Sequence, residues 1–243
     1  MPCFYTPELN LTDDLIIISG SEFHHIIHVF RKKINDKITL SNGKGLLANC
    51  KITGISSKEL TATIIKSMTL EASHPKIVVA FPLLKNKHDN VIIEKLTELG
   101  VKEFFPFTSL RTVRKPSNKT LVKFQKVAIS ALKQCDNAFL PEIHPVYPLF
   151  ELIPRLQDFE LFTAVEFGVH KNLLEIIKNQ TGKQICIIIG PEGGFDEEEV
   201  TDLQKYQVST FTLGNHILRA ETAAIASVSL VVGYLLKEAS DYY

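Results

Sequence analysis

Two stretches in the last third of the chain combine residue types that could hold a ligand. The first, residues 187–195 (IIIGPEGGF), is an apolar run that ends in a glycine-rich loop. Ligands bind at the carboxyl ends of strands in parallel sheets, and Gly193 and Gly194 let the backbone approach one closely. The loop contains Glu192 and no lysine, so it suits a neutral or cationic ligand better than a phosphate. A tight turn without a ligand is the alternative.

The second stretch, residues 213–223 (LGNHILRAETA), again joins the end of a strand to a helix. Arg219 and Glu221 would lie there at the mouth of a largely apolar pocket. An ionisable pair in such a place costs free energy unless it has a partner or a catalytic purpose. We therefore predict a catalytic role for Arg219 and Glu221, and a structural ion pair is the alternative.

The N-terminal part of the chain consists of short β segments separated by turns. Residues 15–68 alternate in hydrophobicity, and residues 42–45 (NGKG) are typical of a hairpin turn. Residues 22–30 are the exception, because Ser21 can cap a short helix there. This pattern predicts a small β-barrel with one helical insertion, followed by a linker at residues 70–75.

After the linker, strands alternate with helices, which predicts a parallel sheet covered on both faces. Gly100 is placed to end the first helix, and Asp196 with Glu199 forms a capping box. The last helix is small or apolar on nearly every side, so we expect it to be buried on every side and packed against a second subunit. The predicted strands are 76–83, 101–107, 160–165, 184–190 and 208–213, and the predicted helices are 89–99, 118–135, 170–180, 196–206 and 220–238.

The composition is that of an ordinary globular protein, with 243 residues of which 45% are hydrophobic and 22% charged. The uncharged run 222–236 has 15 residues, fewer than the roughly 20 that a bilayer span needs. The first residues do not resemble a secretory signal, so we expect a cytoplasmic protein. The cysteines suggest neither a disulfide framework nor a zinc site. They are Cys3, Cys50, Cys135 and Cys186.

The charge is balanced overall and strongly uneven along the chain. Residues 76–140 carry 12 basic and 5 acidic side chains, whereas residues 141–243 carry 7 basic and 15 acidic ones. A local basic surface is typical of a protein that binds a polyanion such as nucleic acid. A solvated helix face is the alternative.

Several motifs resemble one known family. Residues 190–194 (GPEGG) and 213–223 are similar to the two signature stretches of the 16S ribosomal RNA uracil-N3 methyltransferase family of the SPOUT superfamily. The resemblance extends in the same order over most of the chain. It includes residues 95–101, 109–111, 134–135 and 141–143, and in the barrel His25, residues 29–31 and residues 42–45, which are similar to the PUA-like domain of the family.

The resemblance implies an α/β fold with two domains. Residues 1–72 would form a PUA-like RNA-binding β-barrel, and residues 73–243 a SPOUT methyltransferase domain with a deep trefoil knot around its parallel sheet. The knot loops at 163–168, 190–195 and 213–219 would wrap S-adenosylmethionine, and two subunits would pack across the knot as a homodimer. The expected cofactor-binding residues are Thr163, Glu166, Ile189, Gly190, Glu192, Gly193, Gly194, Leu213, Gly214, Ile217, Leu218, Thr222 and Ala223.

The implied reaction is methyl transfer to N3 of a uridine in 16S ribosomal RNA of the small (30S) subunit. Positioning of donor and acceptor should dominate, but the proton on N3 must also leave. Arg219 would stabilise negative charge on the uracil carbonyls, and Glu221 would orient Arg219 or accept the proton. The target base would have to leave its stack. The residues expected to bind RNA are Arg31, Lys32, Lys85, Arg111, Arg114 and Lys115.

Some positions depart from the family pattern, and other functions remain open. Asn137 stands where the family usually has arginine, and Asn35 replaces a turn glycine. The alternatives are a knotted methyltransferase acting on another ribosomal or transfer RNA nucleotide, and a non-catalytic RNA-binding factor. A nucleotide-dependent enzyme is disfavoured because the loop lacks lysine. No metal is expected, since His24, His25 and His28 have no further ligand at a usable spacing.

Overall fold

The computed structural model describes residues 3–73, 75–165, 171–178 and 184–240, with side chains up to residue 237. Its contacts divide the chain into two compact units. The N-terminal unit comprises Met1–Ala72 and Ala128–Leu140, and the C-terminal unit comprises Ser73–Val127 and Pro141–Tyr243. The prediction places one domain boundary, after residue 72. Tertiary contacts also group Ala128–Leu140 with the N-terminal unit, which the sequence did not indicate.

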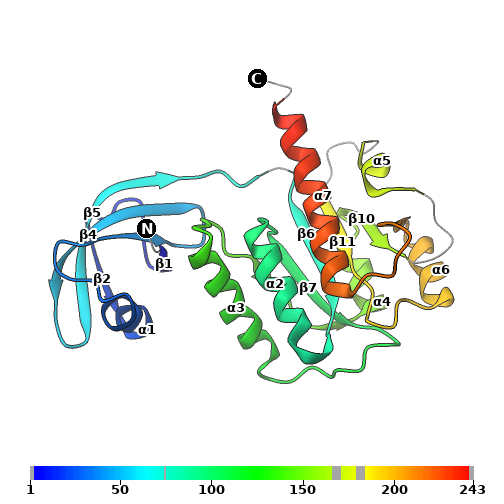
Figure 1. Cartoon of the computed structure of the whole chain (residues 1–243), viewed down its shortest axis with the longest axis horizontal. Helices are drawn as coiled ribbons and strands as arrows, with labels where there is room; N and C mark the ends of the chain where they lie inside the picture. Colours follow the sequence, from blue (N-terminus) through cyan, green and yellow to red (C-terminus); the bar gives the residue numbers. More distant parts are fainter. Residues whose placement is uncertain (1–2, 74, 166–170, 179–183, 241–243) are drawn as a thin grey trace. The chain divides into compact units, whose positions relative to one another are not determined.

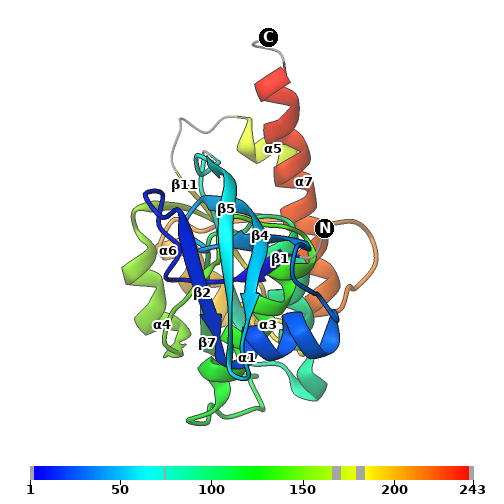
Figure 2. The ribbon, with the colours of Figure 1, turned by 90° about the vertical axis from the view of Figure 1, so that its left-hand side faces the viewer.

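The N-terminal unit is built on one five-stranded sheet in the order β1-β3-β4-β5-β2. Strand β1 pairs in parallel with β3, and the other neighbours are antiparallel. Alternate residues of β2 are buried, as the sequence pattern predicts for a half-buried strand. Figure 2 turns β2, β5 and β4 toward the viewer. The strands are β1 (Cys3–Tyr5), which was not predicted, β2 (Leu15–Ser19), β3 (Lys37–Ser41), β4 (Leu46–Ile55) and β5 (Glu59–Thr69).

The helical insertion differs from the prediction at its start and in its geometry. Helix α1 (Gly20–His24) continues into a π-helical turn, η1 (His25–Val29). Ser19 occupies the N-cap position without a side-chain hydrogen bond, so the predicted cap at Ser21 is wrong. Buried Phe23 and Ile26 fix the insertion against the sheet, and this packing takes the place of the missing cap.

The turn predicted at residues 42–45 contacts the segment that follows helix α3 (Thr120–Gln134). The Leu140 N–H donates to the Gly43 carbonyl at 2.9 Å, and the Gly45 N–H donates to the Ala138 carbonyl at the same distance. Both glycines have left-handed φ angles, +71° and +100°, and a Cβ at Gly45 would lie 2.8 Å from the Leu70 carbonyl oxygen. Glycine is therefore required here by conformation and by space.

The C-terminal unit is built on a parallel sheet in the order β12-β10-β11-β6-β7-β8, with β9 also paired to β7. The predicted strands are found in the predicted order along the chain, and the two-residue strands β8 and β9 were not predicted. The seven strands are β6 (Ile77–Pro82), β7 (Glu103–Thr108), β8 (Glu142–Ile143), β9 (Tyr147–Pro148), β10 (Phe159–Ala164), β11 (Gln184–Ile188) and β12 (Ser209–Phe211).

Helices cover both faces of this sheet. In Figure 1, α2 (His88–Glu98) and α7 (Ala220–Ser240) lie side by side in front of it. Helix α3 contributes Phe124, whose ring centre lies 5.8 Å from that of Phe81. The opposite face packs on α4 (Leu149–Leu152), the 3-10 turn η3 (Ile153–Leu156) and α6 (Glu197–Lys205). The predicted capping box of Asp196 and Glu199 starts α6.

Helix α5 (Leu173–Ile177) is shorter than the predicted helix 170–180, of which residues 170, 179 and 180 lie outside the described residues. Asn172 and Glu175 form a second capping box at its start. The cap fixes the first residue of the helix, and the sequence pattern placed that start too early.

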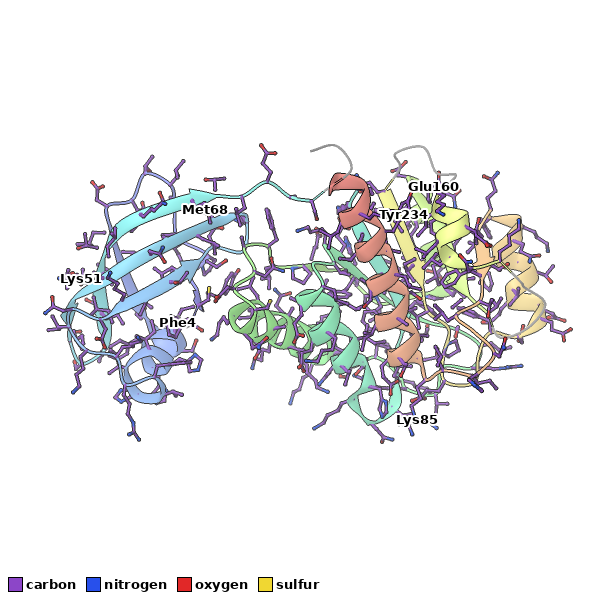
Figure 3. The ribbon with its side chains drawn as sticks, turned by 45° about the horizontal axis from the view of Figure 1, so that its top comes forward. Phe4, Lys51, Met68, Lys85, Glu160 and Tyr234 are labelled. Carbon is purple, nitrogen blue, oxygen red and sulfur yellow. The ribbon has the colours of Figure 1, made fainter. Side chains whose placement is uncertain are left out.

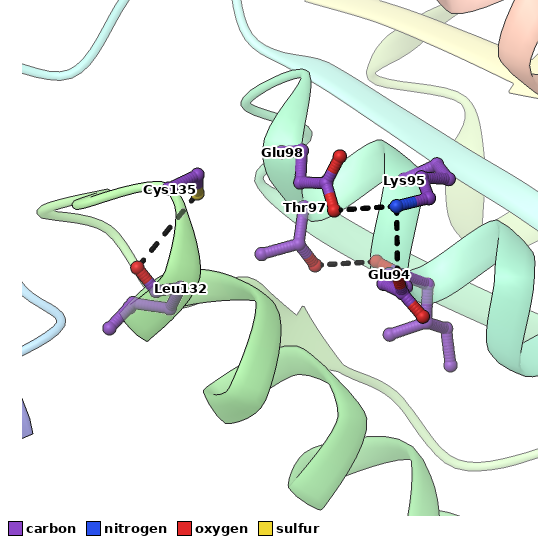
Figure 4. Close-up of polar contacts among 7 residues, drawn as sticks. Glu94, Lys95, Thr97, Glu98, Leu132 and Cys135 are labelled. Carbon is purple, nitrogen blue, oxygen red and sulfur yellow. Dashed lines mark hydrogen bonds and ion pairs between the residues drawn. The ribbon is translucent and has the colours of Figure 1, made fainter. Parts of the chain in front are cut away.

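Helix α2 ends in a motif that explains the stretch 95–101. The Val101 N–H donates to the Leu96 carbonyl and the Gly100 N–H to the Thr97 carbonyl, with Gly100 at φ +84°. This is a Schellman end, for which the predicted Gly100 is suited. Figure 4 shows Lys95 between two glutamates, and the hydrogen bonds to Glu94 and then Glu98 raise its pKa.

Helix α7 is not buried on every side. Val228 and Val231 are fully buried, whereas Leu230 is 40% and Leu236 67% exposed. By length and composition alone, the segment Ala220–Lys237 is long and apolar enough to cross a membrane. The small residues around its circumference therefore leave one apolar face without a partner in the described chain.

Replacing Phe124 by alanine should destabilise the C-terminal unit. Phe124 is fully buried, so its removal leaves a cavity that costs about 3–5 kcal/mol. Val122→Ala on the same helix is the control, because Val122 is 57% exposed and should change stability by about 0.5 kcal/mol or less. Urea denaturation followed by far-ultraviolet circular dichroism measures both, and equal shifts would contradict the packing.

Candidate functional site

A cavity of about 490 Å³ lies at the carboxyl ends of three adjacent strands, β10, β11 and β12. Its volume is that of a site for a small organic ligand, for which roughly 300–1,000 Å³ is usual. The walls come from Ala164 and Val165 after β10, from residues 189–191 and 193–195 after β11, and from residues 212–218 after β12. The first turn of α7 completes it with Ala220 and Ala223.

Many of the residues predicted to bind a cofactor line this cavity. They are Ile189, Gly190, Gly193, Gly194, Leu213, Gly214, Ile217, Leu218 and Ala223. Thr163 does not, because it is fully buried in the sheet and its hydroxyl donates to the Ile188 carbonyl at 2.9 Å. Glu192 and Thr222 are outside the lining, and Glu166 lies outside the described residues.

Other lining residues were not predicted as cofactor contacts. Most of them neighbour predicted residues in the same three loops, and that adjacency could have identified them. Arg111 and Val200 come from other parts of the chain, and no sequence signal placed them at the cavity. The remaining ones are Ala164, Val165, Pro191, Phe195, Thr212, Asn215, His216 and Ala220.

Arg111 holds the glycine-rich loop. Its guanidinium donates to the Gly193 carbonyl at 2.7 Å, and a Cβ on Gly193 would lie 3.4 Å from the Arg111 Cδ. The neighbouring Leu110 N–H donates to Glu199 Oε1 at 3.0 Å. Gly194 has φ +69°, which favours glycine. The loop after β7 therefore fixes the shape of the cavity, and Arg111, predicted to bind RNA, lies at its wall.

Arg114 has a structural partner that the sequence did not indicate. It forms an ion pair with Asp89, which is fully buried, and it donates to the Leu84 carbonyl at 3.3 Å. Its guanidinium also lies 5.8 Å from the centre of the Phe124 ring. Because its charge already compensates a buried carboxylate, the geometry assigns Arg114 to the support of α2 rather than to a free phosphate contact.

The two predicted catalytic residues have different surroundings. The Glu221 Oε1 atom lies 2.6 Å from Nδ1 of His88, the first residue of α2. Arg219 is exposed, and within the described ranges its side chain makes no hydrogen bond or ion pair. The alternative in which Glu221 orients Arg219 is therefore not the arrangement found. The structure brings Glu221 to a histidine 133 positions away.

The turn before α2 links the His88–Glu221 pair to the glycine-rich loop. The Lys85 N–H in this turn donates to Glu192 Oε1 at 3.2 Å. Asn86 and Lys87 follow with left-handed φ angles of 50° and 65°. Two such residues in succession are strained and are typical of functional sites.

The remaining predicted RNA-binding residues are exposed or half-buried on both units. Arg31, with φ 53°, and Lys32 belong to the N-terminal unit, and Lys85 and Lys115 to the C-terminal unit. Lys123, not predicted, joins a cationic cluster with Arg114 and Lys87. Burial lowers the pKa of Lys123, and these two charges lower it further.

Three neighbouring side chains are of types that can bind a metal, but they are arranged as ion pairs instead. Glu103, Glu142 and His144 have ligand atoms within 4.8 Å of one another. Glu103 lies 2.7 Å from Nε2 of His144, whereas Glu142 lies 3.9 Å from the opposite nitrogen, Nδ1. Lys76 forms an ion pair with Glu103, and the His144 ring stacks on Phe105 at 4.0 Å. The group therefore ties β8 to β7.

The most deeply buried cysteines are poor nucleophiles. All four cysteines are reduced. Burial raises the pKa of Cys186 to about 12, and it also raises the pKa of Cys3 to about 12, so both remain protonated near neutral pH.

Comparisons with known proteins match both units. A family model described as an RNA methyltransferase domain matches residues 71–232, and one described as an RNA methyltransferase PUA domain matches residues 18–65. Ribosomal RNA small subunit methyltransferase E of Bacillus subtilis is 30% identical over 227 residues, which is 88% of each chain. The protein of the same name from Mesomycoplasma hyopneumoniae is 34% identical over 62% of this chain and 66% of its own.

Two solved structures are similar in fold and contain a ligand. Ribosomal RNA small subunit methyltransferase E from Neisseria gonorrhoeae, bound to S-adenosylmethionine, has a TM-score of 0.88 and 26% identity, and the match covers 96% of this chain and 98% of that one. A methyltransferase from Legionella pneumophila with bound S-adenosylmethionine has a TM-score of 0.84 and 26% identity, covering 96% and 97%.

Replacing Arg114 by alanine should lower the free energy of unfolding by about 3 kcal/mol or more, because Asp89 then stays buried without a counter-charge. Lys115→Ala, at an exposed neighbour, should change it by about 0.5 kcal/mol or less. Adding Asp89→Asn to Arg114→Ala should recover part of the loss, since the uncompensated charge is gone. Thermal or urea unfolding checks this, and a neutral Arg114→Ala would contradict the role assigned to the pair.

Proposed function

This chain belongs to the RNA methyltransferase family, and from that premise we propose that it methylates N3 of a uridine in 16S ribosomal RNA with S-adenosylmethionine as methyl donor. The observation that carries the proposal is the cavity where the loops after β10, β11 and β12 meet. Relatives that cover most of the chain carry the name of a small-subunit ribosomal RNA methyltransferase.

The cavity suits S-adenosylmethionine by its size and by the chemistry of its walls. S-adenosylmethionine supplies a methyl group on a positively charged sulfur. Ile189, Leu213 and Leu218 offer apolar surface, and the glycines offer backbone groups that a ligand can approach. We propose that these loops belong to the deep trefoil knot that the family resemblance implies.

The protein groups around the cavity support a reaction governed by positioning and charge. Uridine N3 must lose its proton to become a nucleophile, and the carbonyls beside it then carry negative charge. Arg219, exposed and directly before the cavity residue Ala220, is the cation that we assign to this charge. The target base turns out of its stack to reach the site.

The RNA partner is assigned to the basic residues of both units. Arg31 and Lys32 serve in the PUA unit, and Lys85, Lys115 and Lys123 serve in the catalytic unit. We propose that the substrate is 16S ribosomal RNA within the small subunit, in the cytoplasm. Each lost phosphate contact should weaken binding and reduce its salt dependence without changing the base that is methylated.

The exposed apolar face of α7 supports a homodimer. Leu230, Gly233 and Leu236 are exposed on this helix, and they would be covered by a second copy of the chain. Two subunits packed through α7 would hold the first turn of the helix, and with it Arg219, in a fixed place.

A methyl-transfer assay tests the function as a whole. Small ribosomal subunits from cells that lack the protein are incubated with labelled S-adenosylmethionine, and the modified base is mapped. A single N3-methyluridine in 16S RNA is expected. Transfer to a different ribosomal or transfer RNA nucleotide would identify another RNA methyltransferase, and cofactor binding without transfer to any RNA would contradict the catalytic assignment.

Arg219→Ala should reduce methyl transfer by about 10²–10³-fold, because one donor to developing charge is lost. The affinity for S-adenosylmethionine should stay within about threefold. Lys205→Ala is the control, since Lys205 is 69% exposed on α6 and pairs only locally with Asp202. Unchanged activity of Arg219→Ala in single-turnover assays would refute its role.

Leu236→Glu should shift the protein from dimer to monomer, because it places a charge in an apolar interface. Leu11→Glu, in an exposed loop of the N-terminal unit where Leu11 is 63% exposed, should leave the mass unchanged. Sedimentation or light scattering measures both masses. A monomeric wild-type protein would contradict the dimer.

A further inference from the structure

The contact between His88 and Glu221 is the feature that the sequence motifs left unexplained. Nδ1 of His88 and Oε1 of Glu221 lie 2.6 Å apart, which is a short hydrogen bond between groups of this kind. The side chains are 28% and 14% exposed, so solvent or a substrate can still reach the imidazole. Helix α2 contributes the histidine and helix α7 the carboxylate.

The partner of Nδ1 determines which ring nitrogen carries the hydrogen. A neutral imidazole has one N–H donor and one bare acceptor nitrogen, and an ionised carboxylate can only accept. When His88 is neutral and Glu221 ionised, the hydrogen therefore lies on Nδ1, and Nε2 presents its lone pair. Within the described part of the chain no group hydrogen bonds to Nε2 of His88. A carboxylate that holds the far nitrogen of an imidazole is the arrangement of a general base.

The backbone holds His88 in place from two sides. Asn86 and Lys87, at φ 50° and 65°, cost roughly 1–3 kcal/mol each in strain, and the hydrogen bond from Lys85 to Glu192 fixes the start of the turn. Figure 3 shows Lys85 at the end of the C-terminal unit where α7 begins. The imidazole thus contacts the first turn of α7, and the turn that precedes it is hydrogen bonded to the glycine-rich loop.

The pair is not part of the cavity lining, but Glu221 places it beside the rim. Ala220 and Ala223, which flank Glu221 on α7, both line the cavity, and Arg219 directly precedes them. A base at this rim and a cation beside it are the two groups that removal of a proton from a uracil requires.

Resting on the proposed function, we propose that His88 is the general base of methyl transfer and that Glu221 positions it. Nε2 takes the proton from uridine N3, and the N3 lone pair attacks the methyl carbon. The carbon–sulfur bond breaks, and its electron pair stays on sulfur to give S-adenosylhomocysteine. The imidazolium, stabilised by the Glu221 carboxylate, then releases the proton to water. Arg219 stabilises the uracil anion.

Kinetics with His88→Ala test the proton transfer. Single-turnover methyl transfer should fall by about 10²–10³-fold, which is the usual contribution of a general base. The affinity for S-adenosylmethionine should be unchanged, and added imidazole should restore at least about tenfold of the rate. Glu221→Gln should slow transfer without gaining from imidazole, because it leaves the base in place. His24→Asn, an exposed histidine of the other unit, is the matched control.

Activity of His88→Ala within about threefold of wild type would overturn the proposal, and so would a loss that imidazole does not rescue. Nitrogen-15 NMR of the histidines gives a readout that does not need activity. His88, assigned by the peaks missing in His88→Asn, should be the Nδ1–H tautomer at pH 8 in wild type and should lose this bias in Glu221→Gln. An Nε2–H tautomer would overturn the proposal, whereas inactive wild-type protein with the expected tautomer would overturn only the proposed function.

Discussion

The parallel pairing of β10 with both β11 and β12 is the constraint on which the catalytic unit depends. Thr163 pairs with Ile188 on one side and with Thr210 on the other. Since the three strands run in the same direction, the loops that follow them open at one edge of the sheet. Segments far apart in the sequence therefore line one cavity, and every group assigned to the reaction lies on it or at its rim.

The loops around this cavity are held mainly by contacts to backbone atoms. Glu192 and Glu199 each accept from the backbone of another loop, and Arg111 donates to the Gly193 carbonyl. The acidic part of the chain thus meets the basic part directly in this region. Because these contacts fix the loops before a ligand arrives, less ordering remains to be done when the cofactor binds.

The groups assigned to catalysis come from two neighbouring helices, α7 and α2. The first turn of α7 supplies Arg219 and Glu221, and α2 supplies the histidine that Glu221 holds. The start of α2 is in turn supported by the Asp89–Arg114 pair, which lies within one turn of His88. A change at this buried pair would therefore move the proposed base, although neither residue lines the cavity.

The sequence by itself determined the order of the main strands and helices, two of the helix ends and most of the stretches that line the cavity. Gly100 and the capping box of Asp196 and Glu199 are local signals, set by backbone conformation and nearby side chains, and they are found as predicted. The roles of Arg111, Arg114 and His88 were decided only by the tertiary structure. Their partners Gly193, Asp89 and Glu221 lie 82, 25 and 133 positions away, and no local periodicity records such pairs. The same reason applies to Ala128–Leu140, whose helical pattern is local and whose place beside the N-terminal sheet depends on long-range contacts.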